Sequence, residues 1–347
     1  MTAPLRRSLL AGLLLGVFAL SACNKAAEPA SKSDTVNFSI LAPESATSLQ
    51  VFWQPVIDDM QKQTGLKIKP FFGSNYTALI EAMRFKQTDF GWFSNLSGLE
   101  AIRRANGEVF ARTFDPTGDD GYNSVLIVPV NSKITKVEDI LKCDKTLNFG
   151  IGDAKSTSGT LAPMTYLFAP RGIKPETCFK TVRAANHGAN LAAVANGLMD
   201  VATNNTTSLR LQREREAADP KAPKIASKVR VIWTSPRLPE DPIIWRKDLD
   251  PAVKEKLRQF FLTYGQGDSP EAKRQRDLLA KISIGGFKPA DDTHLLPVRE
   301  MEATEALEEA KTAKDPAKIA AAQKTLDDIK AQEAVLQAKT GQPVAAQ

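Results

Sequence analysis

Short apolar segments alternate with amphipathic helices along most of this chain, and the alternation restricts its fold more than any other feature. Residues 35–43 read as a strand, 47–65 as a helix, 66–72 as a second strand and 75–88 as a second helix. Alternation of this kind places parallel strands in one sheet and covers the sheet with helices. The sequence therefore predicts an α/β fold.

A second block of the same kind begins at residue 121, so the 347-residue chain is expected to form two lobes. We expect lobe 1 over 34–120 and 250–300, lobe 2 over 121–249, and a helical tail over 301–347. Each lobe is expected to be a mainly parallel sheet with flanking helices. Because the chain crosses between the lobes twice, a hinged cleft should separate them, and ligands bind such sheets at the carboxyl ends of their strands.

The first 23 residues have the pattern of a secretory signal. A basic start, PLRRS, precedes the short apolar run LLAGLLLGVFAL and the small residues LSAC. The apolar run is too short to span a membrane as a helix. LSAC is similar to a bacterial lipobox, in which Cys23 is lipidated and becomes the new N-terminus; an ordinary signal cleaved nearby is the alternative. Residues 24–34 then form a polar tether, which predicts a protein anchored by lipid on the extracytoplasmic face of a bacterial membrane.

The net charge argues against nucleic acid as a partner. Arg6 and Arg7 leave with the signal, so the 46 Lys and Arg residues fall to 44 against 40 Asp and Glu residues, a balance of +4. A nucleic-acid-binding domain usually has a far stronger positive charge.

Two cysteines remain after the signal, Cys143 and Cys178, each a few residues before an apolar strand. In an exported protein this pattern favours a disulfide between them. Two separate buried thiols are the alternative. No histidine lies at metal-ligand spacing, so neither a metal nor another cofactor is expected.

The stretch GIGDAKSTSGTLAP places three adjacent hydroxyls, Ser156, Thr157 and Ser158, after an apolar strand. Such residues suit a helix start, where side-chain oxygens cap unpartnered N–H groups and the positive end of the helix dipole attracts anions. Tyr76, near another helix start, and His187, at the end of a strand, can add donors. These residues predict a site for a small oxyanion that needs no lysine or arginine, although an ordinary cap also explains the hydroxyl run alone.

The same residues allow an enzymatic alternative. Ser156 or Ser158 with His187 and an aspartate could form a hydrolytic triad. However, the chain has no G-x-S-x-G elbow, and GIGDAKS lacks the P-loop spacing. An exported serine hydrolase is therefore kept only as an alternative.

Five long segments between about residues 36 and 300 carry a family resemblance: MRFKQTDFGWFSNLSGLEAIRRANGEVFA, GYNSVLIV, FGIGDAKSTSG, LAAVANGLMDVATNNT and VIWTSPRLPEDPIIWR. Through these segments the chain resembles the periplasmic phosphonate-binding proteins of ABC importers, a branch of the type II periplasmic-binding fold. The resemblance implies a two-lobed fold with a C-terminal helical extension, and no catalysis. It implies that the cleft captures a phosphonate, 2-aminoethylphosphonate or a simple alkylphosphonate, for an ABC permease and its ATPase.

By this resemblance, the phosphonate oxygens would be held by Ser156, Thr157 and Ser158, with Tyr76 and His187 completing the shell. The hydroxyl run was interpreted above as a site for a small oxyanion, and the resemblance indicates the same residues for this role.

The organic end of the ligand would face Asp241, which could pair with an ammonium. Two positions depart from relatives that bind 2-aminoethylphosphonate: Phe93, followed by Ser94, replaces a tyrosine, and Thr207 replaces a glutamate. Losing one charge-assisted hydrogen bond of about 1.5–3 kcal/mol would weaken amine binding roughly ten- to a hundredfold. Phosphonates without an amine, phosphite, phosphate and other small oxyanions are therefore alternatives.

The tail is rich in alanine, lysine and glutamate and is interrupted at Asp315-Pro316. Its apolar residues form one narrow stripe at coiled-coil spacing: Ile319, Ala322, Leu326, Ile329 and Leu336. The narrow stripe favours a self-association arm and hence a homodimer, with packing on the protein's own body as the alternative.

Overall fold

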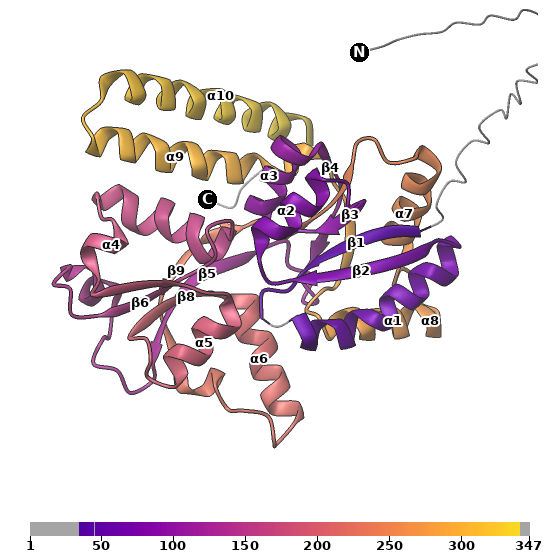
Figure 1. Cartoon of the computed structure of the whole chain (residues 1–347), viewed down its shortest axis with the longest axis horizontal. Coiled ribbons are helices and arrows are strands. Elements are labelled where there is room, and N and C mark those ends of the chain that lie inside the picture. The colour runs from indigo at the N-terminus through magenta and orange to yellow at the C-terminus, as the bar shows by residue number, and fades with distance from the viewer. Residues whose placement is uncertain (1–34, 45, 341–347) are drawn as a thin grey trace, which may run out of the picture. The chain divides into compact units, whose positions relative to one another are not determined.

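The computed structural model describes residues 35–44 and 46–340, which form two α/β lobes and a helical hairpin (Figure 1). The predicted signal, the lipidation site Cys23 and the tether lie outside the described residues. None of the helices in the described ranges is both long enough and apolar enough to cross a membrane. Over the same ranges, no group of three or more His, Cys, Asp or Glu side chains could hold a metal ion.

Lobe 1 is built on a six-stranded sheet in the order β11-β4-β10-β3-β1-β2. Strands β2, β1 and β3 pair in parallel, whereas β10, β4 and β11 are antiparallel to their neighbours. The strands are β1 (Thr35–Leu41), β2 (Lys67–Gly73), β3 (Phe90–Trp92), β4 (Gly107–Phe114), β10 (Pro242–Arg246) and β11 (Gly286–Pro289).

Helices cover both faces of this sheet because each strand presents apolar side chains to both sides. One core cluster holds α1 (Ala46–Thr64), α7 (Pro251–Thr263) and α8 (Pro270–Ala280) against the sheet, and there Phe38 stacks on Phe90 with ring centroids 4.3 Å apart. A second cluster holds α2 (Tyr76–Arg84) and α3 (Asn95–Ala105), and η6 (Asp292–Leu295) follows β11. Burial of these apolar surfaces is the main stabilising term of the lobe.

Lobe 2 is built on a five-stranded sheet in the order β7-β6-β8-β5-β9. Its strands are β5 (Tyr122–Pro129), β6 (Asn148–Ile151), β7 (Thr181–Ala184), β8 (Val201–Asn205) and β9 (Val229–Leu238). Separate apolar clusters cover its two faces. The helical segments are η1 (Val137–Lys142), η2 (Thr157–Leu161), η3 (Met164–Phe168), η4 (Ala169–Arg171), α4 (Pro175–Cys178), α5 (His187–Ala195), α6 (Thr206–Ala218) and η5 (Ala226–Lys228).

Two details of the predicted architecture are wrong. Both sheets are mixed rather than mainly parallel, because β5 and β9 run antiparallel to their neighbours in lobe 2, as β4, β10 and β11 do in lobe 1. The expected end of lobe 2 at residue 249 includes β10, yet β10 pairs with β3 and β4 in lobe 1. The chain therefore returns to lobe 1 between Leu238 and Pro242, several residues earlier than expected.

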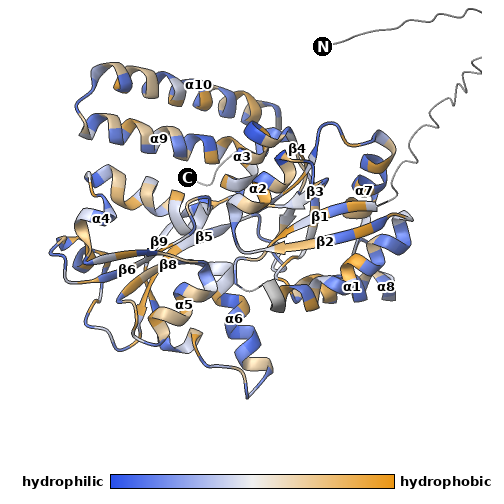
Figure 2. Ribbon diagram, viewed as in Figure 1, coloured by the Kyte–Doolittle hydropathy of each residue, from blue (hydrophilic) through white to orange (hydrophobic). Residues whose placement is uncertain are grey.

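The tail forms a helical hairpin of α9 (Leu296–Thr312) and α10 (Pro316–Thr340), and both helices carry hydrophilic and hydrophobic residues along their length (Figure 2). The predicted stripe packs inside this hairpin: Leu326 and Ile329 of α10 are buried with Leu307 of α9. The stripe therefore packs on the protein's own helix, the alternative that the sequence left open, and the homodimer stays a prediction. Residues 341–347 lie outside the described part.

The structure joins Cys143 and Cys178 in a disulfide, the pairing that the sequence favoured. The bond links the segment after η1 to the end of α4, so it closes a loop with a sequence separation of 35 residues. A crosslink restricts the unfolded chain more than the folded one, and the effect grows with loop length.

Replacing both cysteines by serine should lower the free energy of unfolding by about 3–4 kcal/mol, the loss that the chain-entropy account assigns to a loop of this length. Urea unfolding followed by circular dichroism measures the change. Reduced wild-type protein is the matched control and should unfold with the double variant. Equal unfolding midpoints for the oxidised, reduced and substituted proteins would contradict a stabilising role for this disulfide.

Candidate functional site

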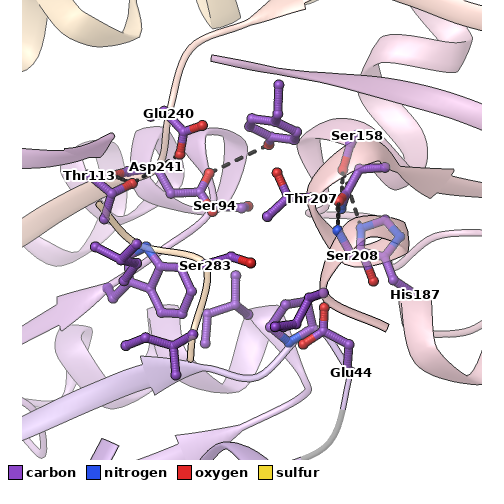
Figure 3. Close-up of a pocket in the computed structure, with 18 of the residues that line it drawn as sticks. Glu44, Ser94, Thr113, Ser158, His187, Thr207, Ser208, Glu240, Asp241 and Ser283 are labelled. Atoms are coloured by element: carbon purple, nitrogen blue, oxygen red, sulfur yellow. Dashed lines mark hydrogen bonds between the residues drawn. The ribbon is translucent and has the colours of Figure 1, made fainter. Parts of the chain in front are cut away.

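A cavity of about 70 Å³ lies between the lobes, at the carboxyl ends of their parallel strands (Figure 3). Lobe 1 contributes Tyr76 and Ser94 to its lining, and lobe 2 contributes Ser156, Ser158 and His187. These residues follow β2, β3, β6 and β7, which explains why residues distant in sequence meet. The cavity occupies the position that the strand–helix alternation predicts for a ligand.

Five helical segments of the described chain begin at this cavity, and each start carries a side-chain cap. The capping residues are Asn75 of α2, Ser94 of α3, Ser156 of η2, Asn186 of α5 and Asn205 of α6. The first N–H groups of each helix lack partners inside the helix, and the dipole leaves partial positive charge there. The convergence of these ends makes the cavity attractive to an anion.

Ser158 connects the hydroxyl run to two neighbouring helix starts. Its Oγ lies 3.2 Å from Nε2 of His187 and accepts a hydrogen bond from Nδ2 of Asn205 at 3.3 Å. Its carbonyl accepts a hydrogen bond from Oγ of Ser124 at 2.6 Å, which fixes the turn against β5. The hydroxyl is therefore positioned by the fold and faces the cavity (Figure 3).

Ser156 and Tyr76 lie on opposite sides of the cleft and contribute neutral hydroxyls. Ser156 caps η2, because its Oγ accepts a hydrogen bond from the N–H of Gly159 at 3.0 Å. This turn is π-helical, a form that occurs often at functional sites. Burial raises the pKa of Tyr76, so its hydroxyl keeps its proton and can donate to an anion.

His187 opens α5 instead of ending a strand as the sequence suggested. Burial lowers the pKa of His187 to about 4, so the ring is neutral at physiological pH and offers one N–H donor. Its Nδ1 is buried and has no hydrogen-bond partner within the described residues. Ser158 and His187 therefore lack the carboxylate that would orient the imidazole of a hydrolytic triad.

The return crossing from β9 to β10 supplies the acidic end of the cavity, Glu240 and Asp241 (Figure 3). Oδ1 of Asp241 accepts hydrogen bonds from Nδ2 of Asn95 at 3.2 Å and from the hydroxyl of Tyr122 at 3.5 Å. Burial, together with the charge of Glu240, raises the pKa of Asp241 well above its usual value. Burial also raises the pKa of Glu240, to about 7.

The structure brings seven of the nine predicted ligand residues to the cavity wall: Tyr76, Ser94, Ser156, Ser158, His187, Thr207 and Asp241. Thr157 and Phe93 do not line it. Oγ1 of Thr157 accepts a hydrogen bond from the N–H of Leu96 at 2.9 Å, so it joins the lobes. Phe93 is fully buried in the core cluster that includes residues of α2 and α3.

Sequence reasoning missed several residues that line the cavity, among them Glu44, Tyr122, Ser208 and Glu240. Glu44 and Glu240 lie in the polar turns APES and LPEDP, which follow strands and belong to the loops where ligands are expected. The sequence around Tyr122 indicated only the start of a strand and gave no sign of a role in ligand binding. Burial raises the pKa of Glu44, while Ser208 and Arg215 lower it.

Contacts across the cleft show that the two lobes are closed on each other. Arg210 of α6 donates to Asp115 beyond β4 with an Nη1–Oδ1 distance of 2.6 Å. The N–H of Gly188 in α5 lies 3.4 Å from the carbonyl oxygen of Pro43 beyond β1. Closure excludes water and so strengthens the electrostatic interactions inside the cleft.

A family model described as the periplasmic substrate-binding protein of phosphonate ABC transporters matches residues 38–295. The chain belongs to this family. It is 40% identical over 285 residues to the phosphonates-binding periplasmic protein of Escherichia coli K12, covering 82% of this chain and 81% of that protein. This phosphonate-binding protein is therefore a substrate-binding transport component and not an enzyme.

Solved structures show the same fold. A binding protein component of an ABC phosphonate transporter from Pseudomonas aeruginosa aligns with a TM-score of 0.80 at 37% identity, covering 87% of this chain and 99% of that one. A Prochlorococcus marinus protein in complex with methylphosphonate aligns with a TM-score of 0.63 at 22% identity, covering 78% and 97%. The two-lobed type II fold with a helical extension is confirmed.

Gly188 leaves little room for a larger residue when the cleft is closed. A Cβ at this position would lie 3.0 Å from both Cα and the carbonyl oxygen of Glu44 on the other lobe. Gly188→Ala should oppose closure by about 1–3 kcal/mol and weaken phosphonate binding roughly five- to a hundredfold. Calorimetry measures the affinity, and small-angle scattering reports the fraction of closed molecules.

Ala189→Ser is the matched control, because it adds one atom at the exposed neighbouring position of α5. Unchanged affinity and unchanged scattering for Gly188→Ala would show that the two lobes do not approach as closely as this packing requires.

Proposed function

We propose that the cleft captures a small phosphonate, a simple alkylphosphonate or 2-aminoethylphosphonate, and delivers it to an ABC permease and its ATPase. The observation that carries this proposal is the convergence of five capped helix starts on a cavity whose described lining contains no lysine or arginine. In this proposal the phosphonate oxygens accept hydrogen bonds from Ser156, Ser158, Tyr76 and His187. Helix dipoles supply the compensating positive potential.

The size of the cavity supports a short organic group. The cavity of about 70 Å³ is clearly larger than the roughly 10–15 Å³ that one buried water needs, so it has room for a ligand of several non-hydrogen atoms. Methylphosphonate, ethylphosphonate and 2-aminoethylphosphonate are small ligands of this kind.

The acidic end supports a phosphonate over inorganic phosphate. Phosphate would turn its fourth oxygen toward Asp241 and Glu240, where it would repel the ionised forms of these carboxyls. A carbon substituent avoids this repulsion, and an ammonium reverses it. Phosphite and phosphate are the second candidates, since one similar protein of Prochlorococcus marinus is named a probable phosphite-binding protein and one of Mycolicibacterium smegmatis a phosphate-import protein.

The location that we propose follows from the N-terminal sequence. Lipidation of Cys23 would hold the protein on the extracytoplasmic face of a bacterial membrane, and residues 24–34 would let the lobes reach the permease. Mass spectrometry of the membrane fraction, with and without Cys23→Ser, tests this anchor.

Replacing Ser156 or Ser158 by alanine should reduce ethylphosphonate affinity about ten- to a hundredfold each, because hydrogen bonds to a charged group are worth about 1.5–3 kcal/mol. Isothermal titration of the tether-free protein with ethylphosphonate, 2-aminoethylphosphonate, phosphite and phosphate measures the loss.

Thr177→Ala, which removes an exposed hydroxyl from α4, is the control and should bind as the wild type does. If both serine variants keep full affinity, the hydroxyls only cap the helix. If phosphate or phosphite binds far more tightly than every phosphonate, the proposed ligand class is wrong.

A further inference from the structure

The acidic end of the cavity contains a buried carboxylate that the sequence did not assign to the site. Glu240 is 8% exposed and lines the cavity beside Asp241. Its Oε2 accepts a hydrogen bond from Oγ1 of Thr113 at 3.2 Å. Its Oε1 is buried and has no partner among the described residues. An unpartnered carboxylate oxygen inside a ligand cavity needs a donor from the ligand, since burial without one is costly.

The basic residues near Glu240 are already paired with other carboxylates. Arg112 forms a bidentate ion pair with Asp120, with Nη1–Oδ1 and Nη2–Oδ2 distances of 3.1 and 3.0 Å. Arg210 pairs in the same way with Asp115. Each arginine therefore has a counterion of its own, and neither hydrogen-bonds to Glu240 in the described structure.

Asp241 likewise has no cationic hydrogen-bond partner among the described residues, because Asn95 and Tyr122, which donate to its carboxylate, are neutral. Glu44, on the other side of the cavity, differs because the positive charge of Arg215 lies near it. Two adjacent carboxylates without a cation thus face a cavity whose described lining has no basic residue. Without a cation these buried carboxyls take up protons more readily, as their raised pKa values indicate. A cation that enters with the ligand would allow them to ionise and would pair with them.

We propose that Glu240 is a second carboxylate, beside the expected Asp241, that binds a primary ammonium at the organic end of the phosphonate. This inference rests on the proposed function and makes aminophosphonates the preferred class. Glu240 thereby supplies the second carboxylate that Thr207, which lines the same cavity, does not. The ligand spans the cleft with its phosphonate at the helix starts and its ammonium at the return crossing.

The charged and titratable groups around Glu240 come from several parts of the chain. They are Arg112 on β4, Asp115 beyond it, Arg210 on α6, Asp241 on the same crossing, and His294 of η6, whose Nε2 lies 2.7 Å from the Glu240 carbonyl oxygen. Because the pKa of Glu240 is raised to about 7, a fraction of this carboxyl is protonated at neutral pH. An ammonium favours the charged form, so binding should release part of a proton from this side chain.

The test compares 2-aminoethylphosphonate with ethylphosphonate, which has a methyl group where the amine ligand carries CH₂NH₃⁺. Glu240→Gln should weaken 2-aminoethylphosphonate binding about ten- to a hundredfold and change ethylphosphonate binding less than threefold. Calorimetry at pH 7 in buffers of different ionisation enthalpy should show that the variant releases less proton than the wild type with the amine ligand. Adding Thr207→Glu to Glu240→Gln should restore part of the lost affinity, because it places a carboxylate on the same cavity.

Glu176→Gln, an exposed glutamate on α4, is the matched control and should leave both affinities unchanged. Thermal unfolding and ethylphosphonate binding check that Glu240→Gln is folded, and Glu240→Asp, which keeps the charge, should retain amine preference if the glutamine variant does not fold. Equal loss for both ligands, or no loss for the amine ligand, would overturn the inference. Failure of the wild type to bind any phosphonate would instead reject the proposed function.

Discussion

The orientation of backbone N–H groups at helix starts is the physical constraint on which the rest of this site depends. Five such starts meet in one cavity, so partial positive charge reaches the ligand without a basic side chain. The convergence follows from the α/β alternation, because each parallel strand ends at the cleft and passes directly into a helix. The capping side chains fix the position of these helix starts, and their hydroxyl and amide groups add hydrogen-bond donors.

Using dipoles in place of lysine or arginine has a consequence for the rest of the pocket. A full positive charge beside the ligand would form an ion pair with Asp241 or Glu240 when the cleft is empty. Neutral donors such as Ser158, Tyr76 and the unprotonated His187 do not compete in this way. The two ends of the cavity can therefore have opposite electrostatic character over a short distance, which favours a ligand whose own charges are separated.

The two α/β lobes could be predicted from the sequence because they depend on the alternation of strand and helix patterns along the chain. The alternation predicted the lobes, and the hydroxyl run at 156–158 predicted a capped helix start at the cleft. Strand direction depends on long-range pairing, so the antiparallel β10 was placed in the wrong lobe. Phe93 and Thr157 have the right local positions but turn toward the core and the other lobe. Glu240 was missed because burial and the absence of a counterion are properties of the packed structure.

The return crossing between β9 and β10, which carries Glu240 and Asp241, is one of the two segments that join the lobes. It connects both sheets, because β9 belongs to the sheet of lobe 2 and β10 to the sheet of lobe 1. A rotation of one lobe against the other would turn about such joining segments, so atoms within them would be displaced least. The two carboxyls would therefore present nearly the same surface to an incoming molecule in an open and in a closed cleft.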